Sequence, residues 1–160
     1  MPELADIARG VIDANTYLAL GTADAAGTPW VSPVFYTPDG YTDFYWVSSP
    51  DTRHSRNIAV RPDVSIAIYD SHSPIGGAEA VYLSATATEV PDEEIDDLAV
   101  LFNGRLPEPK RIGIDELRAP GRIRLYRATV TEHSVLVRGS DPRYGRGTDS
   151  RMTVTIDGQR

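Results

Sequence analysis

The sequence contains no cysteine, so no disulfide, thiolate nucleophile or cysteine-ligated metal site can form. Lysine is nearly absent too, since Lys110 is the only one, and the net charge is −7. This charge argues against nucleic acid or an anionic membrane as the main partner. No stretch approaches the ~20 apolar residues of a membrane-spanning helix, and the opening MPELADIARG lacks the apolar run of a signal peptide. We therefore expect a cytoplasmic protein.

Several catalytic motifs are also missing. There is no Walker loop and no G-x-S-x-G elbow, and His54, His72 and His133 form no metal-ligand pair. A hydrolase would need a nucleophile and a base, which cannot be assembled from these residues. Trp30 and Trp46 could wall a ring-shaped ligand, although such side chains more often belong to a core.

What the sequence does contain is a pattern of short strands. At 160 residues it fits one domain, residues 1–160, with a sizeable core. Alternation and β-rich composition predict about seven strands, at residues 17–23, 29–37, 43–48, 64–69, 81–88, 122–137 and 152–156. Residues 122–137 could form one long bent strand or two. Hairpin-like spacing favours antiparallel pairing and a small barrel, so we expect a mainly β protein with helices.

Four helices are expected beside the strands. Apolar residues at helical spacing predict one at residues 3–13, and acidic residues open another at residue 92. A short helix is expected at 115–118. Pro33 lies inside the second expected strand, where proline cannot donate a ladder hydrogen bond. It therefore marks an edge, a bulge or a place where another group approaches the backbone.

The fourth helix has the features of an anion site. Ser49 is a good N-cap, Pro50 suits the first helical position, and Pro62 ends the helix near residue 60. The helix start offers free backbone N–H groups and partial positive charge. The side chains that could add to a phosphate cradle are hydroxyl, basic or amide groups, with Arg53, Arg56 and Asn57 sharing one helix face: Ser48, Ser49, Thr52, Arg53, Arg56 and Asn57. An ordinary capped helix with solvated arginines fits the same residues.

Four stretches carry a family resemblance: YLALGTADAAGTPWVSPVFYTPDG, DFYWVSSPDTRHSRNIAVRPDVSIAIYD, EAVYLSATATEV and LYRATVTEHSVLV. Together they resemble the pyridoxamine 5'-phosphate oxidase-like flavin-binding split β-barrels. The resemblance implies a homodimer with FMN, or the related deazaflavin, in clefts at its interface. It implies an oxidoreductase in which hydride passes between the flavin ring and a small-molecule substrate, and it assigns no acid or base residue.

The resemblance also assigns cofactor contacts. Thr52, Arg53 and His54 match the family's Ser-Arg-Lys phosphate grip, and Ser48 matches a further hydroxyl contact. The backbone of Ser32, Pro33, Val34 and Phe35 matches the strand facing the isoalloxazine edge. A cofactor beside this strand would explain Pro33.

Departures from the family pattern narrow the expected function. Ser32 and Thr37 replace the biosynthetic oxidase's basic residues, and residues 139–160 lack its C-terminal substrate motif. We therefore expect a chain that does not oxidise vitamin B6. His54 replaces a lysine, so cofactor affinity should depend on pH. The alternatives are a deazaflavin-dependent reductase, a non-catalytic flavin- or haem-binding protein, and a structural dimer with a decayed site. The half-polar strand with Tyr82 also favours a homodimer, because its outer face needs a cover.

Overall fold

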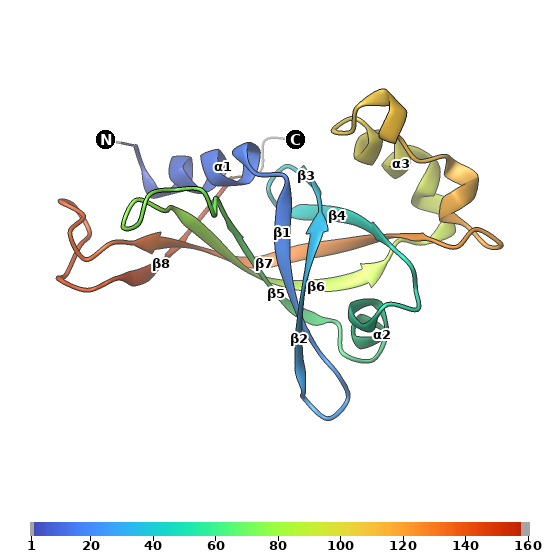
Figure 1. Cartoon of the computed structure of the whole chain (residues 1–160), viewed down its shortest axis with the longest axis horizontal. Helices are drawn as coiled ribbons and strands as arrows, with labels where there is room; N and C mark the ends of the chain where they lie inside the picture. Colours follow the sequence, from blue (N-terminus) through green and yellow to red (C-terminus); the bar gives the residue numbers. More distant parts are fainter. Residues whose placement is uncertain (1, 158–160) are drawn as a thin grey trace.

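One curled antiparallel sheet forms the body of the computed structural model, which describes residues 2–157 (Figure 1). Its strands follow the order β2-β1-β5-β6-β7-β4-β3, and β8 pairs with β7 outside this path. The strands are β1 (Tyr17–Ala23), β2 (Pro29–Phe35), β3 (Thr37–Asp39), β4 (Asp43–Ser48), β5 (Asp63–Tyr69), β6 (Ala80–Glu89), β7 (Arg124–Val137) and β8 (Ser150–Val154). The expected mainly β, antiparallel fold is confirmed.

The sheet follows the alternation of the sequence. In β5, Val64, Ile66 and Ile68 are buried, and in the paired strand β6 Leu83 and Ala85 are buried with them. β7 is a single strand that pairs with β6, β4 and β8, which settles the choice between one strand and two. A register shift at Ser84/Ala85 interrupts its pairing with β6. Such bulges bend a strand and increase its twist, as the curling of the sheet requires.

The helices are α1 (Leu4–Ala14), α2 (Arg53–Val60) and α3 (Ile95–Asn103), with short 3-10 turns at Asp92–Glu94, Glu108–Lys110 and Ile114–Leu117. The apolar stripe of α1 packs on the main core, while α2 lies at the opposite end of the sheet (Figure 1). α3 covers a second cluster built around Tyr45, Ile95 and Phe102. None of the helices in the described residues is long and apolar enough to cross a membrane.

Two strand boundaries differ from expectation and raise the count to eight. The second strand ends at Phe35 and not at Thr37, because Thr37 opens β3 and pairs with Tyr45 of β4. The following turn uses Gly40 and Tyr41, whose φ angles are +58° and +61°. A glycine adopts this left-handed conformation at little cost, so the turn begins one residue later than the Pro-Asp-Gly signal indicates.

The position of β2 decides one of the alternatives for Pro33. β2 stands at the end of the strand order, and Pro33 pairs with Ala19 of β1 on one side. Pro33 therefore lies in an edge strand, where a missing N–H costs the sheet no hydrogen bond. The other side of β2 is free to border a cleft.

Candidate functional site

A cleft of about 740 Å³ lies beside β2. Its walls come from β1, β2, the end of β4, the start of α2 and the segment after α3. The lining residues are Thr16, Tyr17, Pro33, Val34, Phe35, Val47, Ser48, His54, Phe102, Arg105, Leu106, Pro107, Lys110 and Ile112. The structure thus brings together five of the ten residues assigned from the sequence, namely Pro33, Val34, Phe35, Ser48 and His54. Ser32, Ser49, Thr52, Arg53 and Asn57 are not among the lining residues.

His54 is the central polar residue of the inner end of this cleft. It is buried, and its Nε2 forms a 2.8 Å hydrogen bond with Ser48 Oγ and lies 3.3 Å from Thr52 Oγ1. Burial lowers the pKa of His54 because it disfavours the charged imidazolium. His54 is therefore held in place as a largely neutral ring at neutral pH, beside two hydroxyl groups.

The start of α2 differs from the sequence prediction. Thr52, and not Ser49, is the N-cap, and its Oγ1 accepts a 3.3 Å hydrogen bond from the Ser55 N–H. Ser49 organises the preceding turn instead, since its Oγ accepts from the Asp51 N–H. The helix consequently begins at Arg53 and not at Pro50, although it ends before Pro62 as expected. The shift brings Thr52 and His54, but not Ser49, close to Ser48.

The predicted polar face of α2 is divided in the structure. Arg53 and Arg56 are exposed, whereas Asn57 is buried and donates a 3.0 Å hydrogen bond to Thr22 Oγ1 of β1. The guanidinium of Arg53 lies over the indole of Trp30, 4.4 Å from the ring centroid. Asn57 therefore ties the helix to the sheet, and Arg53 flanks the helix start from outside the cleft lining.

Arg105 and Lys110 were not found from the sequence, although both line the outer part of the cleft. Arg105 donates to the backbone carbonyls of Tyr36, at 2.6 Å, and of Asn15, and its guanidinium lies 4.6 Å from the Tyr36 ring centroid. The surrounding segment has no periodicity, so nothing local marked these residues. Only the folded chain brings them next to β2.

The electrostatics of the cleft oppose those of the whole chain. Its lining includes three basic side chains, His54, Arg105 and Lys110, and no carboxylate. No salt bridge in the described part of the chain involves any of the three. In a protein of net charge −7, a cleft of this kind favours an anionic ligand. Tyr17, Phe35 and Phe102 add aromatic walls suited to a flat ring.

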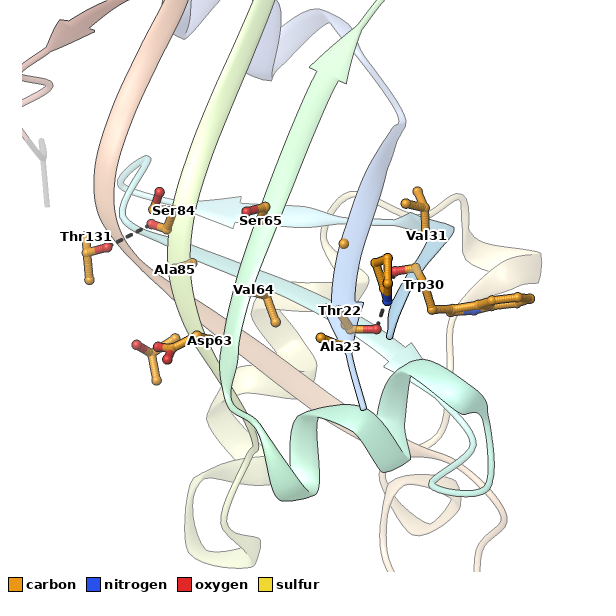
Figure 2. A pocket seen from close by; sticks show the side chains of 13 residues that line it. Thr22, Ala23, Trp30, Val31, Asp63, Val64, Ser65, Ser84, Ala85 and Thr131 are labelled. Carbon is orange, nitrogen blue, oxygen red and sulfur yellow. Dashed lines mark hydrogen bonds between the residues drawn. The ribbon is translucent and has the colours of Figure 1, made fainter. Parts of the chain in front are cut away.

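A second depression, of about 520 Å³, lies on the outer face of the sheet (Figure 2). Its floor is made of small side chains, with Ser65 of β5 opposite Ser84 of β6. Figure 2 shows Trp30 at its border, with the indole projecting away from the strands. A continuation of about 310 Å³ extends past Ala67 and Tyr82. This outer face is the surface that the sequence predicted to need a cover.

The other two histidines lie apart from the cleft. His72 is exposed in the loop before β6, and His133 bonds through Nε2 to the Tyr41 carbonyl at 2.6 Å. Residues 2–157 contain no group of three His, Cys, Asp or Glu side chains that could hold a metal ion.

Comparison with known proteins identifies the relatives of this architecture. The family profile described as pyridoxamine 5'-phosphate oxidase matches residues 4–134. A sequence comparison with curated proteins gives no match.

Solved structures share the fold at low identity. A haem-binding protein from Mycobacterium smegmatis is 22% identical with a TM-score of 0.72, over 96% of this chain and 59% of that one. A haem storage protein from Vibrio cholerae is 22% identical with a TM-score of 0.64, over 91% and 99% of the two chains. An F420 reductase is 19% identical with a TM-score of 0.59, over 83% and 98%. These similarities confirm the expected split-barrel fold.

Proposed function

Because the chain belongs to the pyridoxamine 5'-phosphate oxidase family, we propose that it is an oxidoreductase that binds FMN, or a deazaflavin, in the cleft beside β2 and acts on a small molecule. The observation that carries the proposal is the lining of this cleft. Three basic groups, three aromatic rings and no carboxylate surround a space next to a free strand edge. These features suit a flat ring that bears an anionic tail.

The residues at the inner end fit a phosphate group. Ser48 and Thr52 offer hydroxyl groups, His54 offers an imidazole, and α2 begins immediately after its Thr52 cap with unpaired backbone N–H groups. The free edge of β2 offers backbone polar groups to the edge of a ring. A bound flavin or deazaflavin would supply hydride acceptance and donation, which no side chain of the cleft supplies.

The protein's own contribution is binding, orientation and electrostatics. Arg105 is held by two backbone carbonyls, so its positive charge stays fixed at the cleft with little freedom to lose on binding. A fixed positive charge favours the anionic forms of ligands and of reduced rings. The apolar side chains of Val34, Leu106 and Ile112 limit the access of water to this space.

We also propose that two copies of the chain pair through the outer face of β1, β5 and β6. Small side chains such as Ala67 and Ser84 allow a second surface to approach closely, while Val31 is 65% exposed at the border. An apolar side chain exposed next to such a depression is typical of an interface. A homodimer of this kind would place the ligand clefts beside the interface, as the resemblance implies.

Haem is a second candidate ligand because two of the structural neighbours are haem proteins. Haem requires an axial ligand, and the only imidazole lining the described cleft is His54, which is already hydrogen-bonded to Ser48. The donor set therefore supports a phosphate-bearing ring better than haem.

The experiment that tests this function is the titration of purified protein with FMN, a deazaflavin and haem, together with the absorbance spectrum and mass of whatever co-purifies. We expect micromolar or tighter binding of FMN or of the deazaflavin, weakened by Lys110→Ala and unaffected by His72→Gln, an exposed control. Turnover with a reductant and a substrate panel then separates an enzyme from a carrier. A Soret band without any flavin binding would instead support a haem-binding protein.

A further inference from the structure

Arg53 and Trp30 form a stacked pair at the edge of the cleft. Arg53 is the first residue of α2, and Trp30 is 41% exposed near the start of β2. The guanidinium carbon is 4.4 Å from the ring centroid, within the range of a cation–π interaction. No carboxylate in residues 2–157 forms a salt bridge with Arg53, so the indole is the main contact of its charged group.

We propose that Trp30 is a positioning residue that holds Arg53 for the phosphate of the bound cofactor. The inference rests on the proposed function and adds a residue that neither the sequence nor the family assignment supplies. Stacking occupies the face of the guanidinium and leaves its N–H donors, which lie in the plane, available to an anion. A stacked Arg53 has also lost much of its side-chain freedom before the ligand arrives, which lowers the entropy cost of binding.

The supporting elements make this pair a fixed one. α2 is anchored to β1 by the buried bond from Asn57 to Thr22, and β2 pairs with β1 along its whole length. The indole and the helix start are therefore both set by the same strand. Arg53 also precedes His54, so the two basic groups flank the helix start, one from the cleft and one from outside its lining.

The test is a double-mutant cycle with two ligands. Trp30→Leu and Trp30→Phe are made in the wild-type chain and in Arg53→Ala, and dissociation constants are measured for FMN and for riboflavin by quenching of flavin fluorescence. Riboflavin lacks the phosphate and serves as the matched ligand control. We expect Trp30→Leu to weaken FMN roughly three- to tenfold, with riboflavin changed less than twofold. Trp30→Phe, which keeps a ring face, should recover most of the loss.

The Arg53→Ala background gives the decisive comparison. There the effect of Trp30→Leu on FMN should disappear, because no guanidinium remains to be positioned. Equal weakening of FMN and riboflavin, or the same loss in both backgrounds, overturns the proposal and makes Trp30 a wall of the ring site or a packing residue. Should the leucine variant unfold, Trp30→Gln, which is polar at a partly exposed position, takes its place. Wild-type protein that binds neither ligand rejects the proposed function itself, and the inference with it.

Discussion

Replacing His54 tests the proposed phosphate site through its pH dependence. In the free protein, burial lowers the pKa of His54, so its ring is largely neutral at neutral pH. A bound phosphate acts in the opposite direction, since a negative charge favours the imidazolium and raises the pKa. Binding should therefore take up a proton between the lowered free-state pKa and the raised bound-state pKa. By linkage, the part of the affinity that comes from His54 is present at low pH and lost as pH rises past the bound-state pKa.

The size of the effect follows from the contacts of the ring. A hydrogen bond to a charged group contributes about 1.5–3 kcal/mol, against about 0.5–1.5 kcal/mol for a neutral pair. Charging His54 should thus add about 1 kcal/mol, or roughly fivefold in the dissociation constant. The phosphate's own second ionisation, near pH ~6, works against this trend because the dianion binds better. The wild-type curve should therefore pass through a maximum.

The assay compares FMN with riboflavin from about pH 5.5 to 8.5 in wild type, His54→Gln and His54→Lys. Subtracting the glutamine curve removes the phosphate's titration to first order, and the lysine variant should show only that titration because its charge is permanent. His72→Gln is the control, because His72 lies exposed in a loop distant from the cleft lining. If wild type and His54→Gln have the same pH dependence, His54 takes no part in binding and its bond to Ser48 is purely structural.

Three further outcomes are expected. Asn57→Ala removes the donor of a buried hydroxyl and should lower the free energy of unfolding by about 1–3 kcal/mol, whereas Arg56→Ala on the exposed side should change it by less than about 0.5 kcal/mol in denaturant titrations. Arg105→Ala should weaken FMN and riboflavin together and lower the melting temperature, and a selective loss of FMN would show that Arg105 contacts the phosphate instead. In sedimentation, wild type should run as a dimer, Ala67→Glu as a 17.5 kDa monomer and Val100→Glu, exposed on α3, as a dimer.

The sheet could be predicted from the sequence because its signals are local. Alternation in β5 and β6 reflects a buried face and an exposed face, and Pro33 marked an edge strand before the strand order was known. The residues of the inner cleft could also be predicted, since Ser48 and His54 lie within one strand–turn–helix unit. Distance in the sequence is small there, and local geometry determines which groups meet.

The remaining features depend on tertiary contacts. Ser49 and Thr52 are both good caps by type, and the choice between them was decided by where the chain leaves β4. Helical spacing placed Arg53 and Asn57 on one face, but the sheet buries Asn57 and leaves Arg53 outside. Arg105 reaches the cleft only because its segment folds back against Tyr36, about seventy residues earlier in the chain.

β2 links the two surfaces proposed here, and this arrangement has a consequence for binding. Its Pro33–Phe35 half lines the cleft, while Val31 lines the outer face that we assign to the dimer interface. As an edge strand, β2 has a strand partner on one side only, so a second copy packed against Val31 would restrain the cleft wall as well. Ala67→Glu, which changes no cleft residue, should therefore weaken FMN in proportion to the monomer fraction. An FMN affinity that is unchanged in a fully monomeric Ala67→Glu variant would show that each cleft is complete within one chain.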